Sequence, residues 1–134
     1  MNLLAWLIAE HAVAHDDSSF SVTRAGINEL FAENFPAVVR LFLVARLQLH
    51  ADEIEKLHEL NGRISLEGGK EIATFSSPIA VNATDPPQPN YFWHMVGQVQ
   101  LLLPQAGVYI IEGRVDEDLQ LPLMYLHART RSAT

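Results

Sequence analysis

The chain has 134 residues, of which 49% are hydrophobic and 19% are charged, and its formal net charge is −7. This length fits one packed domain, which we expect to span residues 1–134. Because the sequence has no cysteine, disulfides, thiolate metal sites and cysteine nucleophiles are excluded. Nine Lys and Arg residues against sixteen Asp and Glu residues argue against binding to nucleic acid or to anionic membranes.

The N-terminal segment has an apolar run over residues 3–9, followed by His11 and His15. No Lys or Arg precedes this run, and it is too short to span a bilayer, so we expect it to be mature, soluble structure. Its spacing fits a helical stripe as well as a strand. We predict a strand, because Asp16 and Asp17 signal a turn that leads directly into the next β-like segment.

The middle of the chain alternates between β-like runs and turn signals. Residues 20–27 and 38–50 are β-like, and the second run alternates between an apolar face and a face carrying Arg46. Residues 52–57 combine early acidic residues with helical spacing, which predicts one short helical turn. Two adjacent glycines inside residues 63–75 indicate a β-hairpin.

The last third of the chain continues the same pattern. Residues 83–90 contain three prolines, which lack backbone donors, so we expect an exposed and partly extended loop. Residues 91–103, 108–116 and 119–129 are β-like and are separated by turn residues. Strands at this spacing are typical of an antiparallel sandwich, so we predict an all-β, single-domain antiparallel β-sandwich of about eight strands.

Three stretches also follow the pattern of a known family. They are LLAWLIAEHAVAHDDSSFSVTRAGI, FPAVVRLFLVARLQL and LLLPQAGVYIIEGRVDEDLQLPLMYLHAR. With these stretches the chain resembles a family of small, uncharacterised bacterial β-sandwich proteins. The resemblance implies the sandwich fold and carries over no catalytic residue, because the family has no established activity. His11 stands where the pattern has a larger aromatic residue, which favours a packing role for it.

His11 and His15 form the first candidate metal site, since residues four apart share a face on a helix and an even spacing shares a face on a strand. The zincin motif needs a glutamate directly after the first histidine, and Ala12 stands there. The alternative is a half-buried strand residue at His11 and a solvated turn at His15.

His50, Asp52 and Glu53, with His58 nearby, form the second candidate metal site. They could supply two histidines and one carboxylate, a set that binds transition metals. The alternative is that the two carboxylates favour the start of a short helix. We therefore predict no catalytic residue, no cofactor and no metal site.

The aromatic stretch of residues 91–95 is the candidate surface. Tyr91, Phe92, Trp93 and Met95 must lie on both faces of a strand, so one set fills the core while the other is open to a partner. We predict an interaction surface at these four residues. The alternative is a strand that is buried on both sides or covered by the proline loop.

No nucleophile elbow and no phosphate-binding loop is present in the sequence. We expect a non-enzymatic cytoplasmic domain that binds a protein partner or self-associates as a homo-oligomer. The alternative is a metal- or small-ligand-binding enzyme with histidines and carboxylates at one end of the sandwich.

Overall fold

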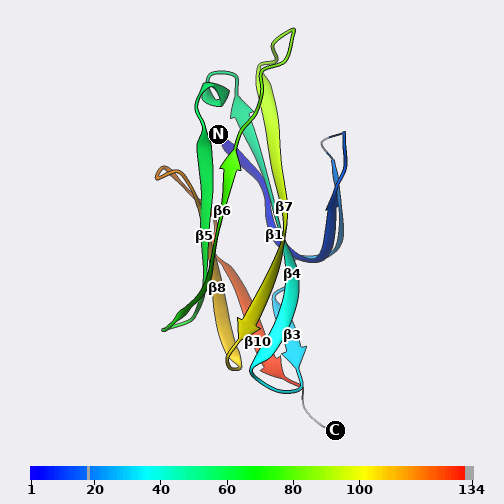
Figure 1. Ribbon diagram of the computed structural model, residues 1–134, viewed down its shortest axis with the longest axis vertical. Coiled ribbons are helices and arrows are strands. Elements are labelled where there is room, and N and C mark those ends of the chain that lie inside the picture. Colours follow the sequence, from blue (N-terminus) through cyan, green and yellow to red (C-terminus); the bar gives the residue numbers. More distant parts are fainter. Residues whose placement is uncertain (18, 132–134) are drawn as a thin grey trace.

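The computed structural model describes residues 1–17 and 19–131, in which the chain forms two packed β-sheets (Figure 1). Sheet A has the strand order β2-β1-β4-β7, and sheet B has the order β3-β10-β8-β5-β6 with β9 paired to β8. The elements are β1 (Asn2–Ala14), β2 (Phe20–Ala25), β3 (Glu29–Ala32), β4 (Ala37–His50), the 3-10 turn η1 (Glu53–Glu55), β5 (His58–Leu66), β6 (Glu71–Ile79), β7 (Asn90–Leu103), β8 (Gly107–Val115), β9 (Leu119–Gln120) and β10 (Met124–Thr130).

This architecture confirms the predicted all-β sandwich. The N-terminal segment is a strand, the short helical turn is η1, and the proline loop separates β6 from β7. The predicted hairpin joins β5 to β6, with Gly68 at φ +74° in its turn. Ser18, part of the predicted first turn, lies outside the described residues.

The prediction differs from the structure in three respects. The described residues form ten strands instead of about eight, because β3 and β9 are too short to show an alternation pattern. The sandwich is also not wholly antiparallel, since β3 pairs parallel to β10. The predicted last strand, residues 119–129, is split at Pro122, which has no N–H to donate to a ladder.

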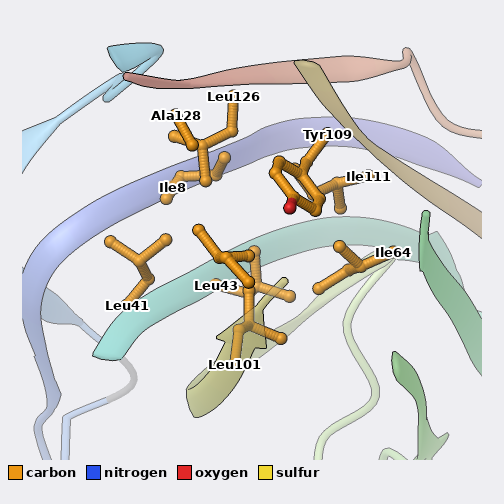
Figure 2. Close-up of a cluster of buried hydrophobic side chains, with 10 residues drawn as sticks. Ile8, Leu41, Leu43, Ile64, Leu101, Tyr109, Ile111, Leu126 and Ala128 are labelled. Carbon is orange, nitrogen blue, oxygen red and sulfur yellow. The ribbon is translucent and has the colours of Figure 1, made fainter. Parts of the chain in front are cut away.

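The core lies between the inner faces of the two sheets. Figure 2 shows side chains from both sheets meeting in one cluster. Its members are the buried residues Ile8, Leu41, Leu43, Ile64, Leu101, Leu103, Tyr109, Ile111, Leu126 and Ala128. Tyr109 is fully buried, and its hydroxyl donates a 2.7 Å hydrogen bond to the carbonyl of Gln105, which fixes the turn before β8.

Two glycines make room for two aromatic rings in this core. Gly62 on β5 and Gly113 on β8 are register partners. A Cβ atom at Gly62 would lie 1.9 Å from Cζ of Phe75, and one at Gly113 would lie 3.0 Å from Cζ2 of Trp6. The two rings lie 6.3 Å apart, and the Trp6 indole Nε1–H donates to the carbonyl of Pro122 at 3.0 Å. The absence of side chains at these positions is therefore a packing requirement.

The substitution Gly62→Ala tests this requirement. We expect a loss of about 1–3 kcal/mol in the free energy of unfolding, measured by urea denaturation, because the Phe75 ring must move. Gly69→Ala in the β5–β6 turn is the control, since the nearest atom to its Cβ position is the Leu66 carbonyl oxygen at 3.9 Å. Equal effects of the two substitutions would show that the space above Gly62 is not needed.

Candidate functional site

β7 lies at one edge of sheet A and, in the described part of the chain, pairs only with β4. Its register with β4 alternates the side chains between the two faces. Tyr91, Trp93 and Met95 point toward sheet B, and Tyr91 is only 6% exposed. Phe92 and His94 lie on the outer face, where Phe92 is 47% exposed. Of the four residues predicted as an interaction surface, Phe92 is thus the outward one.

Tyr91 holds the proline loop at the start of β7. Its hydroxyl oxygen accepts hydrogen bonds from the backbone N–H groups of Thr84 (3.2 Å) and Gln88 (3.0 Å). The threonine hydroxyl lies 3.3 Å from the same oxygen. The buried ring and its polar tip therefore fix the loop to the strand that presents Phe92.

A cluster of rings around Arg46 covers part of the outer face of sheet A. Arg46 on β4 is the register partner of His94. Its guanidinium carbon lies 5.1 Å from the centroid of the Phe92 ring and 6.0 Å from that of Phe20. The Phe20 and His94 rings are 5.9 Å apart. Cation–π contacts at these distances orient Phe92 and leave part of its ring exposed.

Phe20 reaches this face because the β1–β2 hairpin folds across it. β1 pairs with β4 as far as Ala9 and with β2 from Ala9 onward. Figure 1 shows the blue hairpin bending away from the line of β4. Ala12 and Val44 are consequently buried, although Val44 belongs to the outer face, and His11 packs edge-on against Phe42 at 5.0 Å. The adjacent apolar residues Phe42 and Val44, on the face that also carries Arg46, are the sequence signal for this cover.

The two histidines of the first candidate metal site do not converge. His11 contacts Phe42, whereas His15 Nε2 lies 2.7 Å from the Ser21 hydroxyl. In the second site, His50 Nδ1 lies 2.9 Å from the side-chain oxygen of Asn90. Over residues 1–17 and 19–131, no group of three histidine or acidic residues could hold a metal ion.

Glu53 and His58 from that second site belong instead to a hydrogen-bonded group with Asp116 at the end of the sandwich. Glu53 accepts a 2.9 Å hydrogen bond from the His50 backbone N–H. His58 Nδ1 lies 2.6 Å from Oδ2 of Asp116, and its Nε2 lies 2.6 Å from the Glu53 carbonyl oxygen. Both partners are acceptors, so these contacts favour the charged imidazole, in which both ring nitrogens donate.

The environment shifts the pKa values of both partners. The hydrogen bond from His58 to Asp116 raises the histidine pKa, assisted by the Glu53 carbonyl and opposed by burial. Burial acts to raise the pKa of Asp116, but hydrogen bonds from His58 and from the Glu59 N–H lower it more. Asp116 has a φ of +51°, a left-handed conformation that these bonds hold in place. With Nε2 occupied, this pair is suited to structure rather than to proton transfer.

One open hollow of about 350 Å³ lies on sheet B and is lined by Arg63, Glu112, Arg114 and Gln120 among others. Arg63 Nε donates to Glu112 at 2.8 Å, and Arg114 donates to Gln120 at 3.1 Å. The polar groups therefore satisfy one another.

The His58–Asp116 pair predicts a pH-dependent stability. Because folding raises the His58 pKa above its ordinary value of 6.5, its stabilisation is complete below that pH and is lost as the pH rises through the folded pKa. We expect the difference in free energy of unfolding between wild type and His58→Gln to shrink from about pH 6 to about pH 9 in urea titrations. A difference that stays constant over this range would contradict a charged imidazole.

Within the described residues, no helix is long and apolar enough to cross a membrane. Neither the curated proteins nor the solved structures contain a match to this chain. The sequence model of DUF6941, described as a family of unknown function, matches residues 4–124. Because this match spans most of the sequence, the chain belongs to that family of unknown function.

Proposed function

We propose that the protein is a non-enzymatic interaction module, which binds another protein chain through the outer edge of β7 and the adjoining Phe92. The observation that carries the proposal is the chemistry of this edge. β7 has fourteen residues, contains no Asp, Glu, Lys, Arg or Pro, and pairs within the described chain on one side only. A long, uncharged strand edge presents a row of backbone donors and acceptors to a further strand.

The other sheet edges carry features that oppose pairing. β3 has only four residues, and β6 contains Glu71 and Pro78. β2 contains Arg24, and the first half of β1 is interrupted by a β-bulge between Leu3 and Ala5. Charges, prolines, bulges and short length are the usual protection against edge pairing, and β7 has none of them.

Apolar side chains are exposed beside both ends of this edge. Phe92 near the start of β7 is 47% exposed, and Leu102 near its end is 60% exposed. Val38 on β4, the register partner of Leu102, is 61% exposed. These side chains would lose contact with water when a further strand is added. The bacterial cytoplasm is part of the proposal, supported by the cysteine-free sequence and by the resemblance described above.

A panned peptide library tests the proposal. Random peptides are selected on dilute immobilised protein, and the affinity of enriched peptides is measured by fluorescence anisotropy. The variant Gln98→Lys/Gln100→Lys places two charges on the exposed outer face of β7. We expect it to bind the peptides at least about tenfold more weakly than wild type, because charged side chains block edge pairing.

The control Thr23→Lys/Ala25→Lys adds the same charge to exposed positions of β2, at the opposite edge of sheet A. We expect it to bind like wild type. Failure to enrich any peptide, or equal affinity of the two variants, would argue against β7 as the binding edge.

A further inference from the structure

We infer that the strand added at β7 is the β7 of a second copy of this chain, paired antiparallel about Gly97, so that two sheets A join into one. This inference rests on the proposed function and names its partner. A two-fold axis at this position makes each side of the contact identical, as in most homodimers.

The sequence of β7 is self-complementary in this register. On the outer face, exposed Phe92 of one copy lies opposite exposed Leu102 of the other, so the two largest outward apolar residues of the strand meet at both ends. Between them His94 faces Gln100, a polar pair, and Val96 faces Gln98 on either side of the axis. The inward pairs are all apolar: Tyr91 with Leu103, Trp93 with Leu101, Met95 with Val99, and Gly97 with itself.

The length of the strand favours the same arrangement. Every residue from Tyr91 to Leu103 finds a partner in the second copy, so the ladder extends along nearly the whole edge. Figure 1 shows the tip of the proline loop beyond the first residues of β7. Tyr91 fixes that loop at the start of the strand.

Charge also favours a second copy at this edge. Each chain carries a net charge of −7, so two copies repel one another over most orientations. β7 has no Asp or Glu, which makes it the long edge where two acidic chains approach with the least repulsion.

Thiol cross-linking tests the register, because the natural sequence contains no cysteine. Phe92→Cys and Leu102→Cys are prepared separately, mixed, and treated with a short bismaleimide. In the inferred register position 92 of one copy faces position 102 of the other, so the mixture should give cross-linked dimer. Either variant alone should give little cross-linked dimer. Its two thiols lie about ten residues apart along the paired strands, which is about 33 Å at 3.3 Å per residue.

The mixture of Thr23→Cys and Leu102→Cys is the control for random collision. Its yield of cross-linked dimer should not exceed the yield from either variant alone. Circular dichroism confirms that each variant keeps the strand content of wild type. Efficient cross-linking of Phe92→Cys to itself would mean a parallel or shifted register and would overturn the inference.

Sedimentation equilibrium of wild type tests the second copy itself. We expect a monomer–dimer equilibrium whose dissociation constant rises at least about tenfold in Gln98→Lys/Gln100→Lys and is unchanged in Thr23→Lys/Ala25→Lys. A wild-type chain that sediments as a monomer up to high micromolar concentration would overturn the inference. Peptide binding at β7 would then still support the proposed function, whereas loss of both would refute the two together.

Discussion

The two register-paired glycines of sheet B make room for two aromatic rings in the core. Gly62 and Gly113 leave an open strip between flanking apolar side chains, and the rings of Trp6 and Phe75 occupy it. Trp6 packs against the cluster in Figure 2 and against a second group of buried residues that includes Leu47, Leu60 and Leu121. The indole thus helps to join the two halves of the core. Because its N–H is bonded to the Pro122 carbonyl, the ring also positions the break between β9 and β10. The packing of the sandwich therefore depends on the absence of side chains at Gly62 and Gly113 as well as on the two rings beside them.

The elements of the fold were predictable because their signals are local. Alternation over residues 38–50 indicated β4, and the paired glycines after Leu66 indicated the β5–β6 hairpin. The order of strands in each sheet was not predictable, because pairs such as β3 with β10 join segments about a hundred residues apart, which no local pattern encodes. The same holds for the bend of the β1–β2 hairpin over Val44.

The candidate site divides in a similar way. The aromatic stretch at the start of β7 was visible in the sequence, and alternation correctly implied that its side chains occupy both faces. That Phe92 lies outward was not predictable, because either phase of the alternation fits the sequence. The Arg46 contacts and the His58–Asp116 pair depend on tertiary structure, since their partners come from different strands. Histidine spacing alone suggested candidate metal sites, whereas in the folded chain these histidines contact separate partners.

The bent β1–β2 hairpin bears on how large an assembly can grow. A flat sheet with two equivalent open edges adds copies without limit and forms fibres. Here one side of sheet A turns out of the plane and ends in a strand that carries Arg24. In the dimer that we infer at β7, each copy would therefore present this terminated edge on its far side, which favours a closed assembly over an open filament.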